Sequence, residues 1–488
     1  MKSRAVLLSA LLIAAAAVMA AWLLVFRATP HVGGSLRHEV YVWQRAWTAP
    51  VRNAVAQHAT NFSALCVLKA EISWKDRKPQ VTRVALDYTT LAAVVAGNNS
   101  QNGRAGLPVG PDARQRVPTI GLALRIQPYA GPFTAPPELD SSLEGKARHS
   151  VRAAELRGND GAHGVPRPTN PLSESDAITL FLTDLAASLV AEARTNHVNV
   201  GELQIDFDCA ESKLDGYRIW LAAIQRRVAP LPVTITALPS WLDARAFKRL
   251  AVVATNYVLQ IHSLERPKDI QTPFTLCNPR AAQRAVERAG RIGVPFRVAL
   301  PTYGYVMAFD RSGRFIGLSA EGPRPNWPEG AQVREVGADP LAMAALVQGW
   351  VARQPEALRG VIWYRLPVAV DNLNWRWPTL GAIVASHSLG EKLRCEPRRV
   401  EPGLVEINLA NEGELDISSR LAVEVRWTSA RLVAGEALGG FELVDSGASG
   451  VRFQTKSNSF RLRAGDSQKL GWLRFDRDCE VRCEVRKL

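Results

Sequence analysis

Hydrophobic and polar side chains alternate along residues 201–208, which read Gly-Glu-Leu-Gln-Ile-Asp-Phe-Asp. Because the side chains of a β-strand point to opposite faces in turn, the apolar residues of this stretch share one face. Gln204, Asp206 and Asp208 share the other face. A helix-compatible run, residues 214–228, follows directly. The pattern therefore predicts a strand whose polar face ends in two carboxylates just before a helix.

Seven further segments are rich in Val, Ile, Leu or aromatic residues and are bounded by turn residues, as expected of strands. The eight predicted strands are 39–43, 65–72, 120–126, 203–208, 233–237, 257–262, 296–300 and 360–366. Helical patterns lie between many of them, at 50–58, 173–196, 214–228, 242–250, 280–291 and 340–353, and one more follows at 379–387. This alternation predicts an α/β fold, a (β/α)₈ TIM barrel over residues 38–388.

Three long insertions follow predicted strands, so they are expected at the mouth of the barrel, where the carboxyl ends of the strands meet. Residues 77–118 and 127–172 are predicted as long mouth loops, which are typically lids or binding loops. Residues 303–339 contain two β-like runs around Asp-Arg-Ser-Gly, which predict a β-hairpin.

The pattern changes after about residue 390. Short β-like runs separated by turns replace the helical periodicity. A C-terminal β-sandwich domain is therefore predicted over residues 392–488.

The N-terminus carries a targeting or anchoring signal. Lys2 and Arg4 precede an uncharged run, residues 5–26, that is long enough to cross a bilayer. The positive charges before this run place the body of the protein outside the cytoplasm. We therefore expect residues 1–30 to form a signal anchor in the inner membrane, with the body in the periplasm. A cleavable signal peptide ending near Ala20, followed by secretion, is the alternative.

The 488 residues carry a net charge of +14, but Lys and Arg are scattered and form no long basic run. This favours a generally basic surface over a nucleic-acid footprint, and no nucleic-acid partner is expected. Cys66, Cys209 and Cys277 are predicted to be buried thiols. Cys479 and Cys483 are candidates for a disulfide, which an exported location permits.

The inward face of the strand at 203–208 is the main candidate for chemistry. Two confined carboxylates raise the pKa of one of them, which produces an acid beside an ionised base. Asp206, Asp208 and Glu211, which lies just beyond the strand, are therefore candidate catalytic residues. The competing interpretation is structural: Asp208 caps the next helix, or Asp206 pairs with Arg297 or Arg365 inside the barrel.

Other strand ends contribute aromatic and polar side chains to the predicted mouth. Aromatic faces stack on sugar rings, and polar groups orient them. The candidate substrate-binding residues are Trp43, Gln204, Trp241, His262, Tyr303, Tyr305, Trp363 and Arg365. Trp363 is alternatively a core residue, and His262 a hydrogen-bonded structural residue. No metal-ligand spacing, serine nucleophile elbow or phosphate-binding glycine loop is visible, so no metal and no cofactor is expected.

At these residues the chain resembles the chitinase-like glycoside hydrolases of family 18. The fourth strand of that family reads Asp-Gly-apolar-Asp-apolar-Asp-aromatic-Glu, and residues 201–208 align with it. The segment Pro301-Thr302-Tyr303-Gly304 is similar to the family's Pro-x-Tyr-Gly segment, and Trp363 resembles the Trp that ends its last strand. The whole layout also resembles an uncharacterised bacterial family known only as a domain of unknown function.

The resemblance implies that Asp208 is the acid and that Asp206 orients an N-acetyl group of the substrate. The chain departs from the family at Gly201 and Gln204, where the family has Asp. Asp208 replaces a Glu, and His262 stands near the place of a Tyr-Asp pair. We therefore expect an exported envelope protein that binds and hydrolyses a polysaccharide or oligosaccharide. The alternative is a non-catalytic carbohydrate-binding or envelope-assembly protein on a hydrolase fold.

Overall fold

The computed structural model describes residues 29–97, 117–134, 174–262, 266–320, 325–445, 447, 449–457 and 460–488. The expected membrane anchor and most of the expected mouth loop at 127–172 lie outside these residues. Within the described part of the chain, no helix is both long and apolar enough to cross a membrane.

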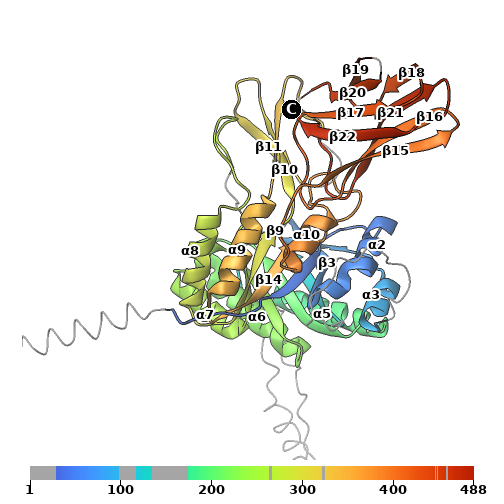
Figure 1. The fold of residues 1–488 in the computed structure, drawn as a ribbon. Coiled ribbons are helices and arrows are strands. Elements are labelled where there is room, and N and C mark those ends of the chain that lie inside the picture. The colour runs from blue at the N-terminus through green and yellow to red at the C-terminus, as the bar shows by residue number, and fades with distance from the viewer. Residues whose placement is uncertain are drawn as a thin grey trace, which may run out of the picture.

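Eight parallel strands form a closed barrel, as predicted (Figure 1). They are β2 (Arg37–Val42), β3 (Ala64–Lys75), β5 (Thr119–Ile126), β6 (Val200–Phe207), β7 (Val233–Ala237), β8 (Tyr257–Gln260), β9 (Phe296–Pro301) and β14 (Leu358–Tyr364). Each strand pairs with the next in this order, and β14 closes the ring by pairing with β2. The carboxyl ends of all eight strands therefore meet at one mouth.

Helices surround the barrel (Figure 1). They are α2 (Ala49–His58), α3 (Tyr88–Val95), α5 (Glu174–Thr195), α6 (Leu214–Val228), α7 (Arg245–Ala254), α8 (Pro279–Gly290), α9 (Pro340–Ala352) and α10 (Trp377–Val384), with short 3₁₀ turns η1 (Ala59–Asn61), η2 (Glu211–Lys213) and η3 (Pro239–Trp241). Asn278 and Asp339 cap α8 and α9, and a proline follows each cap. A side-chain oxygen at the cap accepts from the free N–H groups of the first turn, so these helices begin where the sequence indicates.

The predicted mouth loop at 77–118 is wrong in its first part. Strand β4 (Lys78–Arg83) pairs antiparallel with β3, and α3 follows it. Asp87 caps α3 by accepting a hydrogen bond from the Thr90 backbone N–H, and Leu91 and Val94 are buried against the barrel. The segment was mistaken for a loop because α3 has only eight residues and a weak periodic signal.

The predicted hairpin after β9 is confirmed and gains a third strand. Strand β10 (Gly304–Phe309) pairs with β11 (Phe315–Ser319) on one side and with β12 (Gln332–Gly337) on the other. This small sheet rises from the mouth beside the C-terminal sheets (Figure 1). Two short strands, β1 (His31–Val32) and β13 (Gln354–Pro355), pair with each other.

Two four-stranded antiparallel sheets make up the C-terminal region. One has the order β15 (Leu393–Glu401), β16 (Leu404–Asn411), β21 (Ser467–Phe475) and β18 (Leu432–Ala437). The other has the order β19 (Phe441–Asp445), β20 (Gly450–Thr455), β17 (Leu421–Trp427) and β22 (Val481–Lys487). Apolar residues of both sheets, among them Ile407, Leu473, Val423 and Phe453, share one buried cluster. The core therefore lies between the sheets, as the alternating pattern predicts for a sandwich.

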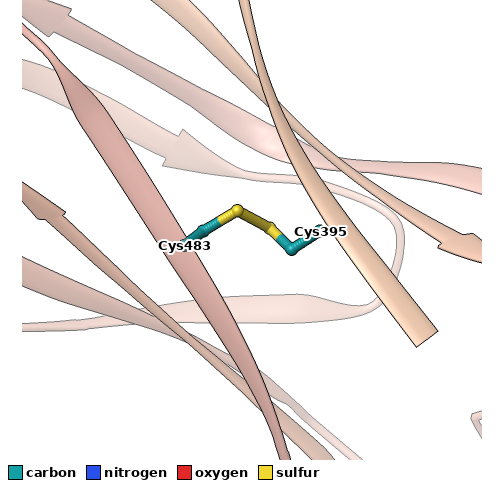
Figure 2. Close-up of a disulfide and its surroundings, with 2 residues drawn as sticks. All are labelled: Cys395 and Cys483. Atoms are coloured by element: carbon teal, nitrogen blue, oxygen red, sulfur yellow. A yellow bond between two sulfur atoms is a disulfide. The ribbon is translucent and has the colours of Figure 1, made fainter.

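A disulfide joins Cys395 of β15 to Cys483 of β22 (Figure 2). These are edge strands of the two different sheets. The predicted candidate pair, Cys479 and Cys483, is therefore wrong, and Cys479 is a free thiol. Four residues of near-extended chain separate Cα atoms by about 13 Å, well beyond the roughly 7 Å limit for a disulfide. Cys66, Cys209 and Cys277 are buried free thiols, as predicted.

Reduction of this disulfide should destabilise the C-terminal sheets. The bond closes a loop with a sequence separation of 88 residues, so its loss restores much conformational freedom to the unfolded chain. We expect a loss of about 2–4 kcal/mol in the free energy of unfolding of this region. Hydrogen exchange of the C-terminal strands in the Cys395→Ser/Cys483→Ser variant, measured at increasing denaturant, gives the loss. A Cys479→Ser variant is the matched control and should unfold like the wild type.

Candidate active site

A cavity of about 300 Å³ opens at the mouth of the barrel. This volume is at the lower end of the range for small-molecule sites. Strand ends and the segments that follow them supply its walls: Tyr41, Trp43, Arg45, Arg125, Asp206, Asp208, Thr236, Gln260, His262, Ala299, Tyr303, Tyr305, Ala320, Tyr364 and Arg365. The cavity therefore combines aromatic faces, carboxylates and guanidinium groups.

Asp206 is buried and held from three sides. The Thr236 hydroxyl and the Gln260 amide donate hydrogen bonds to Oδ1, at 2.9 and 3.0 Å. The Arg125 Nε lies 3.7 Å from Oδ2. Burial raises the pKa of Asp206, while Arg125, Thr236 and Gln260 act in the opposite direction and favour the ionised form. These neighbours fix the orientation of the carboxyl group, but burial outweighs them, so the pKa of Asp206 is raised overall.

Asp208 lies in a different environment two residues further along. Its Oδ1 is buried and has no hydrogen-bond partner among the described residues. Burial, reinforced by the charge of Asp206 and opposed by Arg125, raises the pKa of Asp208 to about 7. The two carboxyl groups thus share a raised pKa but differ in their contacts, because Asp206 accepts two hydrogen bonds and Asp208 Oδ1 accepts none among the described residues.

Five of the predicted substrate-binding residues line the cavity: Trp43, His262, Tyr303, Tyr305 and Arg365. The hydroxyls of Tyr303 and Tyr305 are hydrogen bonded at 3.0 Å, and the Tyr303 and Tyr364 rings meet edge to face. Burial lowers the pKa of His262 to about 4, so its imidazole is neutral at ordinary pH. Together these side chains form a continuous aromatic wall.

Gln204 lies below the cavity rather than in its wall. Its Nε2 donates to the Tyr41 hydroxyl, and its Oε1 accepts from the Cys66 thiol at 3.3 Å. Gln204 is fully buried, so it is connected to the cavity only through Tyr41, which lines the wall.

Trp363 and Trp241 do not line the cavity, contrary to the prediction. The pairing of Ile362 with Ala299 turns Ile362 and Tyr364 inward, so Trp363 points outward to the helices. There its Nε1 donates to His38 at 3.0 Å and its ring packs on Trp375. The core alternative for Trp363 is therefore correct. Trp241 is buried against Phe247, behind the barrel wall.

Glu211 is also placed outside the cavity. It lies on the exposed turn η2, beyond the strand end. The structural alternatives for the aspartates fail as well. Arg297 and Arg365 each bind other carboxylates, and neither η2 nor α6 begins with a side-chain cap from Asp208. Asp206 and Asp208 thus remain the carboxylates of the cavity wall.

Several wall residues escaped the sequence-based interpretation. Arg125 is the most informative, because it is a charged residue near the end of an otherwise apolar strand. Arg125 lies on the same face of β5 as Gly121 and Ala123, which pair with Glu202 and Gln204 on β6. Since Gln204 is on the inward face of β6, the alternation along β5 could have placed Arg125 inside the barrel. Tyr41 and Tyr364 give no comparable signal, since an aromatic in a strand is more often core.

A buried ionic network occupies the opposite end of the barrel interior. The Arg297 guanidinium contacts Glu39 at 2.5 Å and Glu202 at 2.8 and 2.9 Å. Thr234 donates to Glu202 at 2.9 Å. Gly121 leaves room for Glu202, whose Cγ would lie 3.0 Å from an added Cβ. This network forms the floor beneath the cavity.

The segment after β14 connects the cavity to the C-terminal sheets. Arg365 Nη2 donates to Asp371 at 2.5 Å, and Asn374 also donates to Asp371, at 3.0 Å. From the C-terminal region, Arg463 donates to the backbone carbonyls of Asp371, Asn372 and Asn374. One wall of the cavity is therefore braced by a residue that is distant in the sequence.

Among the described residues, no group of three His, Cys, Asp or Glu side chains is placed to hold a metal ion. The absence of a metal or cofactor from the function stays a prediction.

Two family models match parts of the chain. Residues 172–369 match the model of a domain of unknown function, DUF3142. This DUF3142 segment contains Asp206 and Asp208 and ends shortly after β14. Residues 395–476, in the C-terminal sheets, match a second domain of unknown function, DUF8456.

No curated protein matches the chain. Among solved structures, the spore cortex-lytic enzyme SleL of Bacillus cereus is similar at 12% identity over 74% of this chain and 76% of that one, with a TM-score of 0.42. A family 18 chitinase from Chromobacterium violaceum is similar at 11% identity over 91% and 89% of the two chains, with a TM-score of 0.36. The barrel itself is established by its strand pairing.

Proposed function

We propose that the protein is a glycoside hydrolase of the cell envelope, exported and held at the membrane by its N-terminal segment. One observation carries the proposal. Asp208 presents a carboxyl group with an unpartnered buried oxygen and a pKa of about 7 to an aromatic-walled cavity, beside the hydrogen-bonded Asp206. The export and the anchor rest on the apolar run at residues 5–26, behind Lys2 and Arg4.

The chemistry follows from the two environments. Asp208 gives its proton to the glycosidic oxygen as the bond to the anomeric carbon breaks. The carbonyl oxygen of an N-acetyl group on the same sugar bonds to that carbon, and Asp206 stabilises the positive charge that develops on the acetamido group. Water then attacks the anomeric carbon and reopens the ring so formed, and the Asp208 carboxylate takes the proton of that water. Substrate assistance of this kind needs one acid and one orienting carboxylate.

The aromatic wall suits the same ligand. Trp43, Tyr303 and Tyr364 are grouped at the mouth, with ring centroids of neighbouring pairs 5.3–5.5 Å apart. The aromatic faces are apolar and can pack against the face of a sugar ring. The polar groups at the edge of the sugar then reach the hydrogen-bonding groups that lie between the aromatic rings.

Turnover should fall as pH rises through about 7. The Asp208 proton is the one transferred, and the raised pKa means that the protonated form predominates below about 7 and is lost above it. The expected descending limb of the profile of kcat/KM therefore lies near neutral pH. A descending limb that starts above pH 9 would contradict the role of Asp208. A profile measured from pH 4 to 10 decides this.

The experiment that tests the proposal is a turnover assay of the full chain on chitin oligosaccharides and on peptidoglycan glycan strands, followed by mass spectrometry. Release of shorter oligosaccharides with a new reducing end is expected. If the protein binds one of these glycans but cleaves none of them, hydrolysis is excluded.

Such a result would favour a non-catalytic carbohydrate-binding protein. Gln204 motivates this second candidate, because a carboxamide tied to Tyr41 and Cys66 replaces a carboxylate that the chitinase-like pattern supplies. A barrel can keep its groove after losing its reaction.

A further inference from the structure

Three guanidinium groups line the cavity. A neutral sugar has no negative charge for these cations to bind. They belong to Arg45, Arg125 and Arg365. Two of them are bound to dedicated carboxylates. Arg45 makes paired hydrogen bonds to Glu71, at 2.6 and 2.9 Å, and Arg365 binds Asp371 at 2.5 Å.

Arg125 differs from the other two. Its Nε lies 3.7 Å from Asp206, beyond hydrogen-bond distance, and it makes no hydrogen bond to any of the described residues. The side chain is 33% exposed, so the guanidinium faces the cavity instead of the barrel core. An arginine presents five N–H donors in a rigid fork that matches a carboxylate with two parallel hydrogen bonds. Arg125 is thus a cavity donor without a protein acceptor among the described residues.

Two donors of other wall residues are unpartnered but do not reach the cavity surface. The Trp43 indole Nε1 and the Arg365 Nε are buried, and neither has a hydrogen-bond partner in the described part of the chain. An acceptor in the cavity therefore meets the exposed guanidinium of Arg125 and not these two atoms. Carboxylate oxygens accept several hydrogen bonds at once, which a hydroxyl or an amide carbonyl does less well.

Arg125 lies at the centre of the site, because it lines the same cavity as Asp208, His262 and Tyr303, which follow three different strands. Burial raises the pKa of Asp208 and of Tyr303, and the charge of Arg125 opposes both shifts. An anionic group bound to Arg125 would therefore lie beside the proposed acid and against the aromatic wall.

We propose that the cavity selects a sugar that carries a carboxylate, and that Arg125 receives this carboxylate in its guanidinium fork. The inference rests on the proposed glycan site and names its substrate class. The carboxylate has two chemical sources, a uronic acid or the lactyl ether of a muramic sugar. The muramic sugar also carries the N-acetyl group that substrate assistance requires.

The test is calorimetric titration of the full-length Asp208→Asn protein, which prevents turnover, with three disaccharides of equal ring number. They are N-acetylglucosamine linked to N-acetylmuramic acid, N-acetylglucosamine linked to glucuronic acid, and neutral chitobiose. We expect one acidic disaccharide to bind about 10- to 100-fold more tightly than chitobiose, as a charge-assisted pair of hydrogen bonds provides. Which acidic ligand binds more tightly identifies the source of the carboxylate.

Substitution of Arg125 assigns the preference to one side chain. In the Asp208→Asn background, the affinity for the preferred acidic disaccharide is divided by the affinity for chitobiose. Arg125→Gln should reduce this ratio to about one. Arg249→Gln, which removes an equal charge from the surface pair with Asp215, should leave the ratio unchanged. Arg125→Lys keeps the charge but loses the fork, so an intermediate ratio is expected. If Arg125→Gln does not fold, the ratio measured for Arg125→Lys tests the inference in its place.

The inference is overturned if chitobiose binds as tightly as both acidic ligands, if none of the three binds, or if the preference survives in Arg125→Gln. Its failure is distinguishable from that of the proposed hydrolysis. Cleavage of neutral chitin oligosaccharides by the wild-type protein without any acidic preference would retain the hydrolase and reject this inference. Acidic selectivity without cleavage would retain the inference and reject the hydrolase.

Discussion

Asp208→Asn should reduce turnover by a factor of about 10² to 10⁴, the usual contribution of a positioned general acid. The amide keeps the size of the side chain but has no proton to give to a leaving oxygen. Kinetics on the cleaved glycan should show the loss in kcat with little change in KM, because the carboxyl group acts in the transition state. Undiminished hydrolysis by this variant would reject Asp208 as the acid.

The same substitution should stabilise the protein at alkaline pH. The folded state holds the Asp208 proton up to about pH 7, whereas an unfolded aspartate loses it near pH 4. Stability therefore falls as pH rises from about 4 to about 7, and the full loss persists above 7. Asn removes this loss, so the melting temperature of the variant should exceed that of the wild type at pH 8 and match it at pH 4.

Asp215→Asn is the matched control for both effects. Asp215 is an exposed aspartate whose pKa is lowered by its pairing with Arg249. Its replacement should leave turnover unchanged and should not raise the melting temperature at pH 8. A loss of activity in this control equal to that of Asp208→Asn would point to a general effect of charge.

Arg297→Met should destabilise the barrel by about 3–5 kcal/mol, the effect of removing one partner from a buried ion pair. Glu39 and Glu202 would then face each other in the barrel floor without a counter-ion. Burial already raises the pKa of Glu39 even with Arg297 present. Urea denaturation of the variant measures the loss, which should shrink at low pH as the carboxylates take up protons.

Two further variants define the cause of this loss. Arg297→Met combined with Glu39→Gln and Glu202→Gln removes all three charges and should recover most of the stability, because an uncharged floor has no ion to leave unpaired. Arg249→Gln breaks an exposed pair and should have little effect. If the triple variant is no more stable than Arg297→Met, packing and not charge determines the loss.

The barrel and its site strand could be predicted because they depend on local patterns. All eight strands alternate or are uniformly apolar, and the inward phase of β6 follows from Leu203 and Ile205 alone. Trp363 was misplaced because the inward phase of β14 depends on its register with β9, which the sequence of one strand does not reveal. Glu211 was misplaced because a side chain beyond a strand end follows the turn and not the alternation.

The remaining gaps concern long-range partners. Whether Arg365 binds a carboxylate of the site or Asp371 depends on the path of the chain after β14. The partner of Cys483 lies 88 residues away, on an edge strand of the other sheet. Neither the choice of Asp371 by Arg365 nor the partner of Cys483 can be read from residue spacing or composition. Arg125 is the exception, since its phase on β5 pointed inward. Only its ion pair with Asp206 and its lack of a hydrogen bond to the described residues needed the structure.

The contact made by Arg463 restricts the replacement of the C-terminal sheets by a domain from another protein. Its side chain spans a sequence separation of about ninety residues to hold three carbonyls of the segment that positions Asp371 and, through it, Arg365. A foreign module grafted in place of the C-terminal sheets would have to supply a guanidinium at the same point. Recombination between such proteins is thereby confined to donors whose C-terminal sheets already carry that arginine.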